Sequence, residues 1–477
     1  MARRLVSALA LSLSWSATAF AQPVEPAPLP ADIAATADLL IERGLSDDFG
    51  LDFVEGLTTD VGQRLAGSDA EARSRAWSVA KLEALGFANV RIEEFDIPFW
   101  SRLSESASVV SPAPQNLVVT ALGGSAATQA GGITGQIVRF ESLAELQAAD
   151  PATVEGKISF IDEHTTRTQD GSGYGFGVRK RSGCAAATAE KGGIGCLIRS
   201  VGTQPHRMPH TGIMARDAAV GDGPAAALSP PDADQLNRLL ERGPVTVNLD
   251  IQIEAQEAVP SGNVIGEIPG HGDLADEIVL IGCHLDSWDL GTGALDDGAG
   301  CGIVVGAAKL IADLPGDTKR TIRVVLYGAE EVGLFGARAY ATAHAAELGN
   351  HVLASESDFG AGKIWRFQTR FGDAALPYAR AMQSLLAKLG VTPGNNQARG
   401  GPDIGVLAQA GVPVVTPGQN GSDYFDYHHT PDDTFDKINP EDFRQNVAVY
   451  AAFVWLASET GWDFRARFEE EMPAGSG

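Results

Sequence analysis

The sequence predicts an α/β fold, with a mixed, mostly parallel sheet flanked by helices and a β-rich insertion. Three apolar, partly β-branched runs predict buried strands over 277–283, 321–327 and 351–357. Each run ends beside residues that can bind a metal or transfer a proton. We expect these residues to converge, because the active site of an open α/β sheet lies outside the carboxyl ends of its strands.

The first run ends in His284 and Asp286, and a glycine-rich turn with a second acidic pair, Asp296 and Asp297, follows. His284 can bind a metal through one ring nitrogen. We expect the carboxylate of Asp286 to accept the N–H of the other ring nitrogen and so fix the tautomer. The turn leads into a helix-like segment over 301–311. This arrangement at a strand end predicts a metal site.

The other two runs are followed by Glu330-Glu331 and by Asp358, and the pair His428-His429 stands near the end of the chain. Oxygen and nitrogen ligands without a thiolate favour a catalytic zinc pair over a structural zinc. A single acidic residue at a strand end is more often a cap or a turn residue. Four such segments in this order favour a di-metal site.

These segments resemble the co-catalytic zinc aminopeptidase and glutamate carboxypeptidase superfamily. The motifs that carry the resemblance are HLDSWDLGTGALDDGAG at 284–300, AEEVG at 329–333, SESDFG at 355–360 and YHHTPDDT at 427–434. Within the superfamily, PHTG at 209–212, AGVP at 410–413 and the paired histidines are most similar to the carboxypeptidase Q (plasma glutamate carboxypeptidase) branch. The resemblance spans nearly all of the mature chain.

The resemblance implies two Zn²⁺ ions per chain and five metal ligands: His284, Asp296, Glu331, Asp358 and His429. Asp296 would bridge the ions, since the two oxygens of one carboxylate can span a metal pair. The family pattern leaves Asp297 as a turn or cap residue. His429, rather than His428, matches the family's ligand because it stands just before Thr430.

Three residues are predicted to take part in catalysis beside the ligands: Glu330, Asp286 and His428. Glu330 would be the general base toward a metal-bridging water. In glutamate carboxypeptidases a tyrosine precedes the last histidine, and here that position is His428, with Tyr427 one step earlier. The oxyanion role therefore stays open between His428 and Tyr427.

The roles of two further polar residues, His210 and Asp403, stay open. His210 is a candidate because PHTG belongs to the resemblance, whereas the histidines outside the metal motifs otherwise look like surface or packing residues. Asp403 follows a glycine pair and could bind a substrate amine or cap a helix.

The first residues are typical of a signal peptide over 1–21, with Arg3 and Arg4, an apolar stretch over 5–20 and an A-x-A cleavage site before Gln22. We find no other candidate membrane span and expect an exported protein, periplasmic or extracellular. The formal net charge of −25 argues against nucleic acid and anionic membranes as partners.

Changes in composition divide the rest of the chain. We expect a leader and the first part of the peptidase domain over 22–95, and the zinc peptidase domain over 259–465. The segment between them, 96–258, resembles a protease-associated domain and would shape substrate access or a homodimer contact without chemistry of its own. The tail over 466–477 is predicted to be disordered.

The four cysteines of an exported chain permit disulfides. The local pairings are Cys184 with Cys196 and Cys283 with Cys301. Buried free thiols are the alternative.

The sequence thus predicts an exported di-zinc exopeptidase that splits dipeptides or removes terminal residues from short peptides, with the preferred terminus left open. Three alternatives compete with this prediction: a single-zinc glutaminyl cyclase, a non-catalytic relative similar to transferrin receptor, and a periplasmic solute-binding protein. The full ligand set together with Glu330 disfavours all three.

Overall fold

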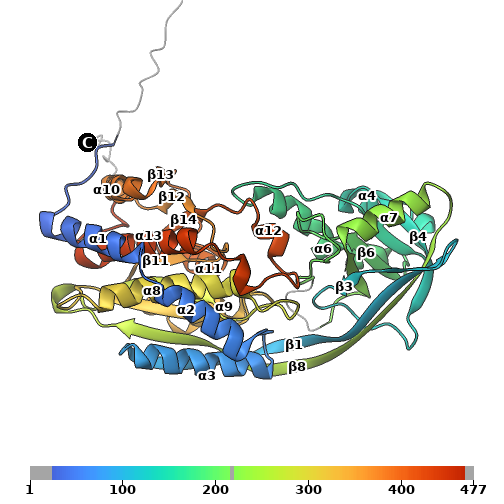
Figure 1. Ribbon diagram of the computed structural model, residues 1–477, viewed down its shortest axis with the longest axis horizontal. Helices are drawn as coiled ribbons and strands as arrows, with labels where there is room; N and C mark the ends of the chain where they lie inside the picture. Colours follow the sequence, from blue (N-terminus) through green and yellow to red (C-terminus); the bar gives the residue numbers. More distant parts are fainter. Residues whose placement is uncertain (1–23, 215–219, 468–477) are drawn as a thin grey trace, which may run out of the picture.

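The computed structural model describes residues 24–214 and 220–467, which form two lobes joined by two long strands (Figure 1). The signal peptide predicted over 1–21 and the tail from residue 468 onward lie outside the described residues. Within those ranges, no helix combines the length and the apolar character needed to cross a bilayer.

In the described part of the chain, fourteen strands form one continuous sheet. They are β1 (Ala88–Ser111), β2 (Gln115–Leu117), β3 (Val119–Ala121), β4 (Ile133–Phe140), β5 (Ile158–Ile161), β6 (Gly195–Arg199), β7 (Ala225–Leu228), β8 (Thr246–Ile268), β9 (Ile278–His284), β10 (Thr321–Tyr327), β11 (His351–Glu356), β12 (Ile364–Arg370), β13 (Thr392–Pro393) and β14 (Val414–Gln419). In the first lobe the order is β13-β12-β14-β11-β9-β10-β8. β9, β10, β11 and β14 are parallel to one another. β8 runs antiparallel to β10, and β12 runs antiparallel to β14 but parallel to β13. The predicted mixed, mostly parallel sheet is confirmed.

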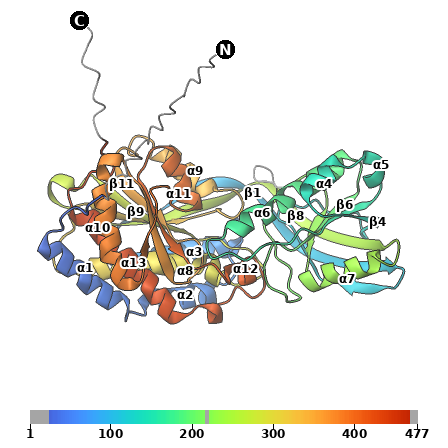
Figure 2. The ribbon, with the colours of Figure 1, turned by 90° about the horizontal axis from the view of Figure 1, so that it is seen from above.

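Helices cover both faces of the sheet in the first lobe (Figure 2). The helices are α1 (Ala31–Gly44), α2 (Phe49–Gly56), α3 (Asp69–Ala84), α4 (Leu143–Ala148), α5 (Pro151–Val154), α6 (Ser172–Glu190), α7 (Pro230–Leu240), α8 (Ala299–Ala312), α9 (Phe335–Ala343), α10 (Leu376–Leu386), α11 (Pro402–Gln409), α12 (Tyr424–Tyr427) and α13 (Pro440–Glu459). The larger apolar core lies between the sheet and α1, α2, α8, α10 and α13, and a smaller core lies under α9 and α11.

The central strand β9 shows why this sheet forms. All seven of its residues are buried, as expected of a strand covered on both faces. Val279 and Ile281 point into the larger core, and Leu280 points into the smaller one. The last residue, His284, pairs in register with Tyr327, the last residue of β10. The polar residues that follow these strands therefore emerge at one edge of the sheet.

The second lobe is reached through β1 and β8, which run antiparallel from one lobe into the other (Figure 1). The predicted boundaries at residues 96 and 258 fall inside these two strands. Strands β4 to β7 pair in parallel in the second lobe, with β3 antiparallel at the end. The likeness of this lobe to a protease-associated domain stays a prediction.

Both local cysteine pairings are present as disulfides. Cys184–Cys196 joins α6 to β6 inside the second lobe. Cys283–Cys301 joins the end of β9 to α8, one residue before His284. The second disulfide thus ties the strand that presents His284 to the helix that follows the acidic turn.

Candidate active site

All five predicted metal ligands lie at the carboxyl edge of the parallel strands, as the strand pattern predicted. His284 ends β9, Glu331 follows β10 and Asp358 follows β11. Asp296 lies in the turn before α8, and His429 follows α12. Segments far apart in the chain therefore meet at one point of the sheet.

Asp296 is the centre of this cluster. Its Oδ1 atom lies 3.2 Å from Nε2 of His284, and its Oδ2 atom lies 3.0 Å from Nε2 of His429. His284 Nε2 is also 3.5 Å from Oδ1 of Asp358, and His429 Nε2 is 2.9 Å from Oε2 of Glu331. Two groups of three possible ligands result, and they share Asp296. Within each group the ligand atoms lie within 4.8 Å of one another.

The burial of so many acids is costly unless a positive charge lies among them. Burial is the main reason that the pKa of Glu331 is raised to about 7. The carboxylate of Asp296 also raises this pKa, and the nearby His429 ring lowers it. Burial and the carboxylates of Asp358 and Glu331 raise the pKa of Glu330 well above its usual range. Within the described residues, Oε1 of Glu331 is buried without a hydrogen-bond partner. Oδ2 of Asp296 is also buried, and its close contacts with histidine nitrogens lack hydrogen-bond geometry. Acceptors left in this state fit dications bound between them.

Asp286 orients the site, but through atoms other than those predicted. The His284 ring nitrogen Nδ1 lies 3.0 Å from the main-chain carbonyl oxygen of Asp286, and 3.8 Å from its carboxylate. The expected carboxylate contact is therefore wrong. The carboxylate instead accepts the main-chain N–H groups of Glu330 and Glu331, at 3.0 and 3.2 Å. It holds the turn that carries both acids, because β9 and β10 are neighbours in the sheet.

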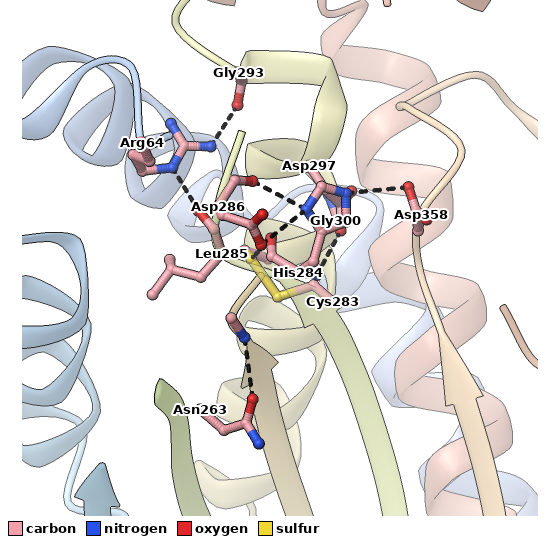
Figure 3. The surroundings of a disulfide bond; sticks show 12 residues. Arg64, Asn263, Cys283, His284, Leu285, Asp286, Gly293, Asp297, Gly300 and Asp358 are labelled. Atoms are coloured by element: carbon pink, nitrogen blue, oxygen red, sulfur yellow. Dashed lines mark hydrogen bonds and ion pairs between the residues drawn. A yellow bond between two sulfur atoms is a disulfide. The ribbon is translucent and has the colours of Figure 1, made fainter. Parts of the chain in front are cut away.

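Asp297 is a turn and cap residue, as the family pattern implied. Its carboxylate accepts the main-chain N–H groups of His284, at 3.1 Å, and Gly300, at 3.0 Å (Figure 3). Gly300 lies against the strand end that leads to Asp358, and a Cβ atom there would lie 1.9 Å from the carbonyl oxygen of Ser357. The glycine therefore allows the acidic turn to approach β11.

Arg64 is a structural residue of the site whose role the sequence did not indicate. Its side chain is completely buried and donates to the carbonyl oxygens of Leu285 and Gly293, at 2.7 and 2.8 Å (Figure 3). It also donates to the carbonyl oxygen of Thr292, at 2.7 Å. Burial lowers its pKa to about 10, against the opposing effect of Asp433. The guanidinium fixes the loop between β9 and the acidic turn.

A cavity of about 890 Å³ opens over the cluster. Residues of both lobes line it, including Tyr174 and Arg181 of α6 beside Glu330 and His428. The second lobe therefore contributes side chains to the wall of the cavity, which agrees with the expectation that it shapes substrate access. The PHTG motif marked one of the segments involved, and its His210 lies 2.9 Å from His428.

Three other residues have clear positions near the cluster. The Trp288 indole N–H donates to Oε2 of Glu331, at 2.7 Å, and so contacts one of the predicted metal ligands. Tyr427 is partly buried and packs against the larger apolar core. Asp403 is fully buried, and the residue that precedes α11 is Gly401, without a side-chain cap. The position of Asp403 therefore supports neither of its predicted roles, as a ligand of a substrate amine or as a helix cap.

The fold and this cluster define the class, a metallo-exopeptidase, and comparisons with known proteins agree. The profile of Peptidase family M28 matches residues 263–454. Carboxypeptidase Q of Mus musculus is 33% identical over 406 residues, which cover 85% of this chain and 84% of that protein. A crystal structure of a peptidase M28 precursor from Shewanella amazonensis SB2B is 51% identical, with a TM-score of 0.89, and covers 91% of this chain and 98% of its own.

The chain belongs to peptidase family M28. An aminopeptidase from Aneurinibacillus sp. strain AM-1 shares the fold at 20% identity, with a TM-score of 0.63 over 90% of this chain and 97% of its own. The resemblance stated from the sequence motifs is therefore confirmed at the level of the family and of its relatives named carboxypeptidase Q.

Proposed function

We propose that this chain is an exported di-zinc exopeptidase that splits dipeptides or removes terminal residues from short peptides. The observation that carries the proposal is the pair of three-residue ligand groups that share Asp296. Nitrogen and carboxylate ligands without a thiolate favour catalytic zinc. A structural neighbour from Bacillus subtilis is named a zinc aminopeptidase, and the predicted signal peptide supports export.

One zinc ion would be held by His284, Asp358 and Asp296, and the other by Glu331, His429 and Asp296. Bound zinc supplies a water of lowered pKa and polarises the scissile carbonyl group. The protein's own residues then hold the substrate and move protons.

Glu330 is the proposed general base. It lines the cavity, and Asp286 fixes its main-chain position. A carboxylate whose pKa is raised by burial can take a proton from the attacking water and give it to the leaving amine. The adjacent Glu331 lies in contact with His429, at 2.9 Å, so the two neighbouring acids can divide these tasks.

His428 is the proposed donor to the oxyanion. Its Nε2 atom lies 3.2 Å from Oδ2 of Asp296, and its side chain lines the cavity. Burial and the neighbouring His429 lower the pKa of His428 well below its usual range, so its ring is neutral and can donate one N–H. The position of Tyr427 against the apolar core favours His428 for this role.

Two arginines support a substrate that carries a free carboxylate. Arg366, near the start of β12, and Arg399, before α11, both line the cavity. Neither guanidinium forms an ion pair with a carboxylate within the described ranges. The Arg366 guanidinium lies 4.6 Å from the Trp365 ring centroid, and the Nε atom of Arg366 and the Nε1 atom of Trp365 are buried without a hydrogen-bond partner there. Unpaired donors in an acidic protein suit the carboxylate of a short peptide.

Zinc content tests the proposal directly. Metal-saturated, desalted protein should contain two zinc ions per chain by elemental analysis. Asp296→Ala should lose both ions or nearly so, because it removes the shared ligand, whereas His284→Ala should mainly empty one site. A wild-type content of one ion or none would contradict the di-zinc assignment.

The general base is tested by paired variants of adjacent acids. Glu330→Gln keeps the size of the side chain but removes its basic oxygen, so kcat should fall by at least ~10²-fold with zinc still near two. Glu331→Gln, the matched control, should lose zinc. Metal loss in the first variant and retention in the second would reverse the two roles.

The oxyanion donor is tested by His428→Ala beside Tyr427→Phe. Removal of one preorganised donor should lower kcat by ~10²–10³-fold without release of zinc. The tyrosine variant should change kcat little, because the Tyr427 side chain packs against the larger apolar core. An unchanged kcat for His428→Ala, measured on one dipeptide with zinc in the same samples, would exclude the histidine from this role.

Carboxylate recognition is tested with a dipeptide and its C-terminal amide. If Arg366 binds the terminal carboxylate, Arg366→Gln should raise KM for the dipeptide by about 10–100-fold, the range expected of hydrogen bonds to charged groups. The amide should be a poor substrate of both proteins, with little further change in the variant. Equal KM values for the dipeptide and the amide in the wild type would contradict recognition of the terminal carboxylate. Dipeptide amides with an acidic N-terminal residue test whether the arginine binds a side-chain carboxylate instead.

A further inference from the structure

The paired histidines are held from the second lobe by one short segment, 210–212. His210 is completely buried, and its main-chain N–H donates to the hydroxyl oxygen of Ser200, at 2.9 Å. Its ring nitrogen Nε2 lies 2.9 Å from Nδ1 of His428. The two rings are 5.0 Å apart between centroids. The side chain of His210 is thus fixed at the back of His428, on the side away from Asp296.

The next two residues, Thr211 and Gly212, contact His429, mainly through their main chain. The main-chain N–H of Thr211 donates to the carbonyl oxygen of His429, at 3.0 Å, and the carbonyl oxygen of Thr211 lies 3.3 Å from Nδ1 of that histidine. Gly212 has a φ of 132°, and a Cβ atom there would lie 2.2 Å from an Arg181 guanidinium nitrogen and 2.9 Å from His429 Nδ1. Residue 212 can lie this close to Arg181 and His429 because it has no side chain.

The hydrogen bond between His210 and His428 has a preferred direction. Within the described residues, Nδ1 of His210 is buried without a partner. A buried acceptor nitrogen left unpaired is less unfavourable than a buried N–H left unpaired. The proton of His210 therefore belongs on Nε2, which donates it to Nδ1 of His428. Because Nδ1 of His428 accepts this hydrogen bond and so carries no proton, the proton of the His428 ring is on Nε2, the atom that faces Asp296.

We infer that His210 is a positioning residue, which holds His428 in the tautomer that presents an N–H to the reacting carbonyl group. The inference rests on the proposed oxyanion role of His428. It gives the second lobe a part in catalysis beyond lining the cavity. A comparable contact, in which a second residue fixes the tautomer of a functional histidine, changes activity by about 10–100-fold when it is removed.

The test compares His210→Phe and His210→Gln in the wild-type and His428→Ala backgrounds. The phenylalanine variant keeps a flat ring but cannot donate, so kcat should fall by about 10–100-fold with KM and zinc content unchanged. Glutamine keeps an N–H donor and should restore most of the lost kcat. In the His428→Ala background, His210→Phe should have no further effect, because the two residues act as one unit.

A spectroscopic measurement tests the tautomer without relying on activity. In zinc-loaded protein with ¹⁵N-labelled histidine, Nε2 of His428 should be protonated and Nδ1 should be an acceptor, and His210→Phe should change this pattern. If the wild-type protein does not hydrolyse peptides, the proposed function is wrong. The spectrum still shows whether His210 fixes the tautomer of His428.

Three results would overturn the inference. The first is an equal kcat loss for His210→Phe with and without His428, which would show that His210 acts independently. The second is a change confined to KM, which would make His210 a wall of the cavity. The third is loss of zinc from the phenylalanine variant, since His210, His428 and His429 also lie close enough together to hold an ion.

Discussion

The site depends on the position of one buried carboxylate, that of Asp296. Its two oxygens face Nε2 atoms of three histidines at 3.0 to 3.2 Å, and these histidines come from the end of β9 and from the segment after α12. Burial alone would raise the pKa of Asp296, but the histidine rings around it hold that pKa well below the usual range. An acid that stays ionised between histidines and other acids can bridge two cations.

The surrounding structure keeps that carboxylate in place from several directions. Asp297 and the Cys283–Cys301 disulfide tie the acidic turn to β9, and Arg64 fixes the loop between them. Asp286 holds the turn of Glu330 and Glu331 through two main-chain N–H groups. The second lobe fixes the remaining side of the site through residues 210–212. Residues of both lobes therefore lie at one site.

The sequence predicted the parts of this site that follow from local pattern. Runs that are buried on both faces become parallel strands, and this pattern alone places His284 and Asp358 at one edge. It could not indicate which oxygen of Asp286 faces His284, because that depends on the path of the chain after the strand ends. Contacts such as His210 with His428 join residues 218 positions apart and form only when the lobes pack together. No local signal predicts such a contact, although the PHTG motif marked the segment.

The most direct measurement is an anomalous difference map at the zinc edge from crystals of the zinc-loaded protein. Two peaks should lie on either side of Asp296, one beside His284 and Asp358 and the other beside Glu331 and His429. A single peak would contradict the bridging role of Asp296. A peak among His210, His428 and His429 would show that the second lobe binds metal instead of positioning a histidine.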